Sequence, residues 1–387
     1  MAHLTTVHSA YDSRILEREC RTLAAAGCRV TLIAPHERDE RVGGVQIVGL
    51  PRPSGRAARW TRTVPACHRA AVATGAELFH LHDPELLPLG LLLRRGGARV
   101  VADLHEHLSK DLRSKEWIPR PLRGFASLGA GLCERLLAGG MSHLIAATPD
   151  IARQFPESRV TVVANYPLLE DLSAASRSPY EHRPARVLYA GELSARRGSL
   201  SMARAAELLA ARERAEIVVM GRFASASEEA AARREPGWRR VNYLGVRRWA
   251  EVADAIATSR VGLLLYHPAP NHEEAWPRKL FEYLAGGLPV VFSDLPGWRR
   301  LLDDVGCGIA VDPADPTRVA DAVAWLLAHE REAREMGERG RRAAVERFNW
   351  SSQGERLLDL YRRLLARETD RRPESRRSRS RERSGRS

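Results

Sequence analysis

The sequence predicts an α/β protein built from two doubly wound, Rossmann-like domains that face a central cleft. Its 387 residues are enough for two domains that each bury their own core. Strand-like and helix-like patterns alternate along almost the whole chain, which is typical of parallel sheets covered by helices. Residues 166–184 interrupt the alternation with three prolines and several serines, and therefore predict a linker between the domains.

The first half opens with a strand over residues 3–7, followed by an amphipathic helix over 14–27. Gly27 suits the C-terminal end of that helix, because glycine adopts the left-handed conformation common there. Short runs rich in valine, isoleucine and leucine predict the remaining strands. These strands are expected at 29–35, 77–81, 98–104, 143–147 and 159–164.

The second half repeats the alternation and ends in a long helix. Strands are expected at 185–191, 216–221, 241–245, 260–266, 289–293 and 307–311, with helices from about 199 and at 249–257, 278–287 and 317–328. The last helix, 351–366, gathers Leu357, Leu360, Tyr361 and Leu364 on one apolar face, so it must dock on another element.

The predicted domains follow from these elements. They are a first Rossmann-like domain with its linker at 1–180, a second Rossmann-like domain at 181–347, a C-terminal helix at 348–366 and a tail at 367–387. The tail is rich in arginine and serine and has no aliphatic or aromatic residue after Ala366, so we expect it to be disordered. The formal net charge is +13, which leaves nucleic acid or an anionic membrane as alternative partners of the tail.

Several chemistries lose support from missing motifs. The chain has no GxxxxGK[ST] phosphate loop, no GxGxxG turn after a strand, no DxD, no HExxH and no GxSxG. Its five cysteines form no CxxC pair, and the N-terminus carries no apolar signal segment. We therefore expect reduced thiols in a cytoplasmic protein of bacterial type, with no metal site.

The stretch HEEAWPRKLFEYLAGGLPVV is the most informative part of the chain. Pro277 suits the first turn of a helix, and Arg278 and Lys279 follow beside free backbone N–H groups. Cations at a helix N-terminus form an anion site. Glu274 and Glu282 are eight residues apart, near two helical turns, so they are expected to share a side. The alternative is a solvated amphipathic helix with an Arg278–Glu282 pair.

With these residues the chain resembles the retaining glycosyltransferases of family four (glycosyl transferases group 1), which have the GT-B fold. Glu274-x7-Glu282 followed by AGGLPVV looks like the family's E-x7-E motif. VHSAYDSRILEREC, FHLHDPELLP, VVADLHEHL, YAGELSARRGSL, VVMGRF and FNWSSQGERLLDLYRRLL resemble other family segments in order and spacing. The resemblance covers about residues 3–366 and implies a C-terminal helix that crosses back to the first domain.

The resemblance implies a donor site in the second domain. Glu282 matches the carboxylate that accepts from the ribose hydroxyls, and Glu274 matches the residue facing the donor sugar. Arg197 and Lys279 match the cations on the donor diphosphate. Gly221 lies where the family's backbone approaches the nucleotide. Arg222 beside it is assigned to the same donor site.

In the first domain, His105 matches the histidine that contacts the donor sugar and is assigned a catalytic role with Glu274. His8, Asp12 and Arg14 lie in the loop that faces the acceptor.

Two departures from the family pattern bear on these assignments. Glu192 stands where an arginine often follows the glycine of the G-x-L loop, so one phosphate contact is lost or supplied by Arg196. VHSAYDS replaces the glycine-rich turn after the first strand.

The implied reaction moves a sugar from a nucleoside diphosphate (UDP, GDP or dTDP) to a hydroxyl of a glycan, lipid-linked or natural-product acceptor, with retention. Arg197, Lys279 and the helix N-terminus can stabilise the leaving diphosphate without a metal, and no cofactor is expected. Two alternatives remain: a nucleotide-sugar epimerase of similar fold, and a protein that uses the basic tail to bind a nucleic acid or a membrane surface. Nucleic acid is the less favoured of these partners.

Two further segments each allow two interpretations. His80, His82 and Asp83 form an H-x-H-D group at a strand end, but no second cluster is visible to complete a metal shell. A turn or cleft-lining role is therefore expected for them. The helix-like stretch 117–140 combines Arg120 and Arg123 with apolar positions. It either packs within the first domain or rests on the inner face of a membrane that carries a lipid-linked acceptor.

Overall fold

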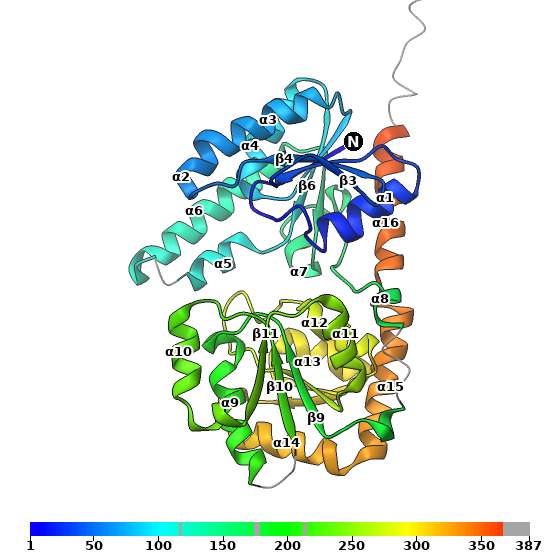
Figure 1. The fold of residues 1–387 in the computed structure, drawn as a ribbon. Coiled ribbons are helices and arrows are strands. Elements are labelled where there is room, and N and C mark those ends of the chain that lie inside the picture. The colour runs from blue at the N-terminus through cyan, green and yellow to red at the C-terminus, as the bar shows by residue number, and fades with distance from the viewer. Residues whose placement is uncertain (116–117, 174–178, 212–214, 367–387) are drawn as a thin grey trace, which may run out of the picture.

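The computed structural model describes residues 1–115, 118–173, 179–211 and 215–366, so the tail predicted at 367–387 lies outside the described residues. Figure 1 shows two sheets, each flanked by helices, one above the other, with helix α16 running along the side of the first-half sheet. The first sheet ends with strand β8 (Val160–Val162) and the second begins with β9 (Arg186–Ala190), so the predicted linker runs between them.

The first sheet has eight strands in the order β3-β4-β2-β1-β5-β6-β7-β8, all parallel except β3 against β4. The chain starts in the middle of the sheet, at β1, and winds to both edges. The first seven strands are β1 (Ala2–Leu4), β2 (Thr31–Pro35), β3 (Glu40–Val42), β4 (Val45–Leu50), β5 (Leu78–Leu81), β6 (Arg99–Leu104) and β7 (His143–Ala146).

Helices cover both faces of this sheet. They are η1 (Ile15–Cys20), α1 (Arg21–Ala25), α2 (Arg56–Ala58), η2 (Arg59–Thr63), α3 (Val64–Ala73), η3 (Pro84–Leu86), α4 (Leu87–Arg95), α5 (Leu108–Ser114), α6 (Arg120–Gly139), α7 (Pro149–Ala152) and η4 (Glu157–Arg159). Helix α8 (Glu170–Ser173), in the linker, packs instead against the second half, where Leu172 joins the core.

The second sheet has six parallel strands in the order β11-β10-β9-β12-β13-β14. Counted from β9, this is the 3-2-1-4-5-6 order of a Rossmann fold. Its other strands are β10 (Glu216–Met220), β11 (Val241–Gly245), β12 (Val261–Leu264), β13 (Val290–Ser293) and β14 (Gly308–Val311). Its helices are η6 (Tyr180–His182), η7 (Ala195–Arg197), α9 (Ser199–Ala210), α10 (Ala226–Arg234), η8 (Pro236–Arg240), α11 (Trp249–Thr258), α12 (Arg278–Ala285), α13 (Pro296–Val305), α14 (Pro316–Ala328) and α15 (Glu330–Glu346).

The last helix, α16 (Trp350–Ala366), joins the two halves. Its apolar face, including Leu357, Leu360 and Tyr361, packs into the core formed by η1, α1 and the first sheet. Trp350 Nε1 also donates a hydrogen bond to Thr22 Oγ1 at 2.8 Å. The predicted apolar face therefore docks on the first half, as the implied crossing helix requires, and the predicted fold class is confirmed.

Two local expectations differ from the structure. Glu274 does not share a helix with Glu282, because α12 begins only at Arg278 and Pro277 is its N-cap; Glu274 lies in the preceding turn. The β3–β4 hairpin was not expected. Its turn holds Gly43 and Gly44 with φ of +55° and +83°, the left-handed pair that closes two-residue hairpins.

Candidate active site

The predicted donor residues gather where the second sheet reverses its winding. Strands β9 and β12 are neighbours at its centre, and their connections run to opposite sides. In doubly wound sheets this reversal opens a crevice at the carboxyl ends of the strands. The loop after β9 holds Glu192 and Arg197, and the segment after β12 leads into Lys279 on α12.

Lys279 is a buried cation without a hydrogen-bond acceptor. Its residue is 9% exposed, and within the described part of the chain its Nζ has no hydrogen-bond partner. Nζ lies 3.9 Å from the ring centroid of Tyr189 and 5.5 Å from that of Tyr266. Burial, and then the nearby charge of Arg197, lowers the pKa of Lys279 well below its ordinary value. The aromatic faces hold the ammonium, but they do not neutralise it.

Glycines let the neighbouring loops approach this ammonium. A Cβ at Gly191 would lie 2.3 Å from Lys279 Nζ, and φ there is +146°. A Cβ at Gly221 would lie 1.9 Å from the carbonyl oxygen of Gly191, so the loops after β9 and β10 touch backbone to backbone. Gly221 therefore packs against the lysine's own loop, and Arg222 beside it is exposed.

Arg197 lies at the same crevice and is paired. Its Nη1 is 3.2 Å from Glu192 Oε1, and its guanidinium lies 5.7 Å from the ring centroid of Tyr266. Burial alone would lower the pKa of Arg197, but Tyr266 and Glu192 raise it overall. Glu192, which departs from the family pattern, therefore forms an ion pair with one edge of the Arg197 guanidinium, the group predicted to bind the donor diphosphate. Arg196 holds the segment after β12 through its carbonyl, which accepts the N–H of His267.

The two carboxylates of the predicted motif have different partners. Glu282 is 4% exposed, and its Oε1 lies 2.6 Å from Arg278 Nε, so the predicted i,i+4 pair is present. Glu274 Oε1 accepts a 2.7 Å bond from Arg300 Nη2. A Cβ at Gly297, in the first turn of α13, would lie 2.8 Å from Glu274 Oε2. This helix start favours a negative charge.

The acceptor-side residues lie at the matching reversal of the first sheet, between β1 and β5. His8 Nδ1 is 3.5 Å from Asp12 Oδ2, and Asp12 Oδ1 accepts the backbone N–H groups of Arg14 and Ile15. Burial would lower the pKa of His8, but the Asp12 hydrogen bond and the charge of Asp83 raise it overall. Burial would raise the pKa of Asp12, whereas its bonds to His8 and the backbone hold it far below its ordinary value.

The acceptor contact predicted for Arg14 must be corrected. Its residue is 3% exposed, and its Nε and Nη2 donate to the two oxygens of Asp103 at 2.8 and 2.9 Å. Its Nη1 donates to the carbonyl oxygen of Val163 at 3.0 Å. With its donors turned into the core, Arg14 acts on the site through Asp103, which also holds His105 Nε2 at 2.8 Å.

A side-chain contact links the two crevices. Arg278, in the first turn of α12, donates from Nη1 to Ser13 Oγ in the first-half loop. His105 lies next to His8, with ring centroids 5.2 Å apart. The structure therefore gathers Arg197, Lys279 and Glu282 on one side and His8, Asp12 and His105 on the other.

Several buried residues near the first crevice were not predicted as site residues, although Tyr361 was placed on the apolar face of the last helix. They are His3, Glu19, Asp103 and Tyr361. Of these four, Asp103 alone could be noticed in the sequence, as a carboxylate near the carboxyl end of the strand predicted at 98–104. The others meet through sheet register and helix docking, which spacing along the chain does not show.

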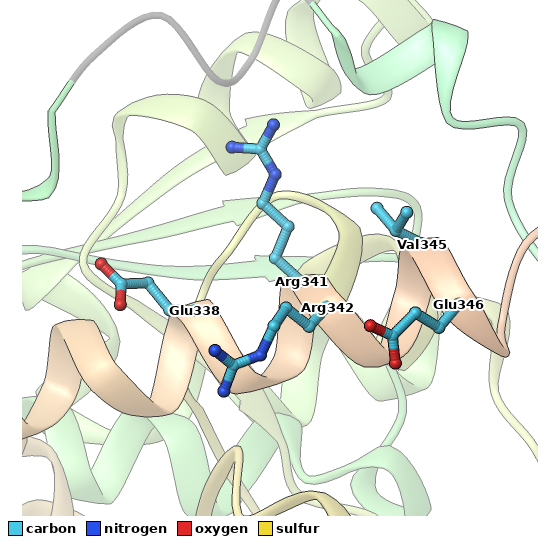
Figure 2. Close-up of a pocket in the computed structure, with 5 residues that line it drawn as sticks. All are labelled: Glu338, Arg341, Arg342, Val345 and Glu346. Carbon is cyan, nitrogen blue, oxygen red and sulfur yellow. The ribbon is translucent and has the colours of Figure 1, made fainter.

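Two surface hollows lie on the second half. One, of about 340 Å³, is lined by residues that all belong to α15 and are drawn in Figure 2: Glu338, Arg341, Arg342, Val345 and Glu346. A hollow lined from a single helix has no facing wall to enclose a ligand. The other, of about 450 Å³, runs along one face of β10 from Glu216 to Met220, beside Asp254 and Ala255 of α11.

Comparison with known families matches both halves. The family described as "Glycosyl transferases group 1" matches residues 184–329, and the family "Glycosyl transferase 4-like domain" matches residues 13–166. The phosphatidyl-myo-inositol mannosyltransferase of Mycobacterium leprae is 25% identical over 92% of this chain and 93% of its own length. A D-inositol 3-phosphate glycosyltransferase of Xylanimonas cellulosilytica is 37% identical over 32% of this chain and 26% of its own length.

Solved structures share the architecture. Sucrose-phosphate synthase from Thermosynechococcus elongatus aligns with a TM-score of 0.74 at 20% identity, covering 95% of this chain and 99% of its own. HepE from Anabaena, in complex with UDP and glucose, aligns with a TM-score of 0.69 at 13% identity, covering 93% and 98%. At these identities the likeness shows the fold alone, which is GT-B.

Proposed function

Because the chain belongs to the group 1 glycosyltransferases, we propose that it transfers a sugar from a nucleoside diphosphate to a hydroxyl of a lipid-linked acceptor, with retention and without a metal at the donor site. Membership of this family favours sugar transfer over the two alternatives, an epimerase and a protein that uses the basic tail to bind a nucleic acid or a membrane surface.

The observation that carries the donor site is the buried ammonium of Lys279. A buried cation without an acceptor costs free energy that a bound anion would recover. Cleavage of a sugar–diphosphate bond places negative charge on the leaving group beside Lys279, Arg197 and the start of α12. Charge-assisted hydrogen bonds contribute about 1.5–3 kcal/mol each, and a helix end about 0.3–1 kcal/mol.

Retention without a covalent enzyme intermediate requires the acceptor hydroxyl to attack from the face of the leaving group. In this proposal His105 and Glu274 contact the donor sugar from opposite halves, and Glu282 accepts from the ribose hydroxyls. His8 and Asp12 meet the acceptor. Asp103 fixes the His105 ring through the 2.8 Å hydrogen bond to Nε2.

An exposed apolar stripe on α6 supports a lipid-linked acceptor. Its side chains follow helical spacing and are 54–78% exposed: Leu122, Phe125, Leu128, Leu132 and Leu136. Arg120 and Arg123 lie at the start of the same helix. An apolar stripe with flanking arginines suits shallow insertion into an anionic membrane surface. The name of the M. leprae relative also contains a lipid, phosphatidyl-myo-inositol.

In this proposal the protein works in the cytoplasm, at the inner face of the membrane. All five cysteines are free, in keeping with a reducing compartment. Among the described residues, no helix is both long and apolar enough to cross a bilayer. Attachment would therefore depend on the α6 stripe.

The donor assignment is tested by incubating the protein with UDP-, GDP- and dTDP-sugars, with and without EDTA, and vesicles containing phosphatidylinositol. We expect one donor to give a glycosylated lipid in EDTA, and NMR of the product to show the anomeric configuration of the donor. An inverted product would contradict retention. A released isomer of the donor without any glycosylated product would contradict transfer.

Membrane contact is tested separately by vesicle flotation. Phe125→Ser combined with Leu132→Ser should reduce binding to anionic vesicles at least tenfold, because each side chain contributes about 1.5–3 kcal/mol when buried. Val345→Ser, at a 53% exposed position on α15, is the matched control. Equal flotation of all three proteins would contradict a docking role for α6.

A further inference from the structure

We propose that the core of the first half binds a structural zinc ion through His3, Glu19, His80 and His82. All four side chains are fully or almost fully buried, and one ligating atom from each lies within 4.8 Å of the others. The inference is independent of the donor chemistry proposed above, because these residues belong to the other half of the molecule.

The distances within the cluster fit a four-coordinate ion. His3 Nδ1 is 3.0 Å from His82 Nε2, and Glu19 Oε2 is 4.0 Å from each of these two atoms. His80 Nδ1 is 3.8 Å from Glu19 Oε2. Zinc bonds of about 2.0–2.1 Å in a tetrahedron separate the ligating atoms by about 3.3–3.5 Å. The observed separations lie on both sides of that value, so small side-chain shifts complete the shell.

Sheet register and an unusual helix turn bring these residues together. His3 and His80 are direct cross-strand partners in the parallel pair β1–β5. His82 follows two residues after His80 and points to the same face. Glu19 lies in η1, a π-helical turn over Ile15–Cys20, and such turns are often found at functional sites. His3 and Glu19 therefore supply the additional metal ligands that the sequence did not reveal beside His80 and His82.

Without a cation the cluster leaves buried polar atoms unsatisfied. Among the described residues, neither oxygen of Glu19 and not Nε2 of His80 has a hydrogen-bond partner, and both residues are 0% exposed. Arg14 Nε lies 3.0 Å from Glu19 Oε1 but is aimed at Asp103. Orphaned buried polar groups cost about 1–3 kcal/mol each, and more when charged. A cation among the four side chains would satisfy Glu19 Oε2, while Glu19 Oε1 lies 3.0 Å from Arg14 Nε and His80 Nε2 faces Asp103 Oδ2 at 4.0 Å.

Further residues complete the surroundings of the histidines. Asp103 Oδ2 lies 3.5 Å from His82 Nδ1 and 4.0 Å from His80 Nε2, the nitrogens that face away from the ion. Carboxylates commonly orient zinc-bound histidines in this way. Tyr361 Oη lies 2.5 Å from His80 Nδ1 and 3.5 Å from His3 Nε2. When His80 Nδ1 binds the ion, this hydroxyl pairs with His3 Nε2 instead.

The types of donor atom in the cluster suit a metal ion. Neutral imidazole is the form that ligates metals. Three imidazoles and one carboxylate favour zinc, and four protein ligands leave no open position, so the ion would be structural.

The first test is metal content. Full-length protein from zinc-supplemented medium should contain one zinc per chain, and dialysis against a chelator should lower the midpoint of thermal unfolding by several degrees. Adding back zinc should restore it, and cobalt should give the intense visible absorption of a four-coordinate site. Absence of stoichiometric zinc, together with no rise in the midpoint when zinc or cobalt is added, would overturn the proposal.

Variants locate the ion. His80→Gln and Glu19→Gln should abolish stoichiometric zinc, whereas His143→Gln, in strand β7 of the same sheet, should keep it. Lys279→Met should keep it too, since that residue lies in the second half. If the cluster variants do not fold, the cobalt spectrum of wild-type protein decides. A spectrum without histidine nitrogen ligands, or zinc retained by a folded His80→Gln protein, would contradict the site.

Discussion

The two crevices of the molecule differ in how their buried charges are neutralised. In the first half, Arg14 donates to both oxygens of Asp103, so a buried cation and a buried carboxylate satisfy each other. In the second half, Lys279 is buried among aromatic rings, and no described residue accepts a hydrogen bond from it. The difference separates structure from binding: the Arg14–Asp103 pair is completed within the chain, whereas Lys279 requires an anion from outside.

The largest expected effect breaks the completed pair. Asp103→Asn leaves Arg14 buried without its counter-charge and should lower the free energy of unfolding by about 3–5 kcal/mol. Burial alone would raise the pKa of Asp103, but Arg14 and then His105 hold it well below its ordinary value. Asp103 is therefore ionised in the folded protein, and the substitution removes its negative charge. Urea denaturation at pH 7.5 measures the change.

The control is Asp150→Asn, which removes a more exposed carboxylate 2.6 Å from Lys110 Nζ. It should cost at most about 1 kcal/mol. Equal losses for Asp103→Asn and Asp150→Asn would show that burial does not distinguish the two pairs.

Lys279→Met should instead lower activity while leaving the free energy of unfolding unchanged or higher. Removing one charge from the donor site should lower kcat/KM by about 10²–10³, equivalent to 2.7–4 kcal/mol, as for loss of one transition-state donor elsewhere. The free energy of unfolding without ligand should stay equal or rise, because burying the Lys279 amine without an acceptor costs free energy whether it keeps or loses its proton. Lys115→Met, at an exposed ion pair with Asp111, should change neither quantity. A large loss of stability in Lys279→Met would assign the lysine to structure instead of binding.

Glu134 on α6 offers a buried carboxyl in the first half without an arginine clamp. Its residue is 4% exposed, its Oε1 has no hydrogen-bond partner within the described residues, and burial raises its pKa to about 7. The folded protein then holds a proton that the unfolded chain releases above about pH 4.5. Stability is therefore lost as the pH rises toward 7 and stays lower above it.

Glu134→Gln should accordingly be more stable than wild type at pH 8, by up to about 3 kcal/mol at 1.36 kcal/mol per pKa unit, and similar to it at pH 4.5. Paired denaturation curves at the two pH values measure the difference. A gain of the same size at both would exclude ionisation of Glu134 as its cause.

The smallest expected effect concerns Glu192. It pairs with Arg197 at 3.2 Å, and both side chains are 35% exposed, so the pair contributes at most about 1 kcal/mol. Glu192→Gln should free Arg197 and tighten nucleoside diphosphate binding a few-fold. Weaker binding in isothermal titration calorimetry would instead mean that Glu192 positions Arg197 for the ligand.

The sequence predicted the second crevice better than the first. Lys279, Arg278 and Glu282 are close along the chain, so a motif and a helix start locate them together. Glu274 was misplaced because spacing alone does not tell where α12 begins, although Pro277 gave the signal.

The charge cluster of the first half could not be read from spacing. Arg14 looked like a loop residue that faces the acceptor, yet it folds inward onto Asp103, which is 89 positions away. Tyr361 reaches His80 from the other end of the chain only because α16 crosses to the first sheet. The alternation of elements, in contrast, follows from local periodicity and predicted both sheets. Gly43 and Gly44 are the sequence signal of the β3–β4 hairpin, although no hairpin was predicted there.

The most direct test of the difference between the crevices is whether an anion changes the protonation of Lys279. Titration calorimetry with the tightest-binding nucleoside diphosphate, in two buffers of different ionisation enthalpy, counts protons taken up on binding. Because the pKa of Lys279 is depressed before binding, a diphosphate beside it should raise that pKa, so wild type should take up protons that Lys279→Met does not. Equal proton uptake and equal affinity in the two proteins would contradict a donor diphosphate site at Lys279.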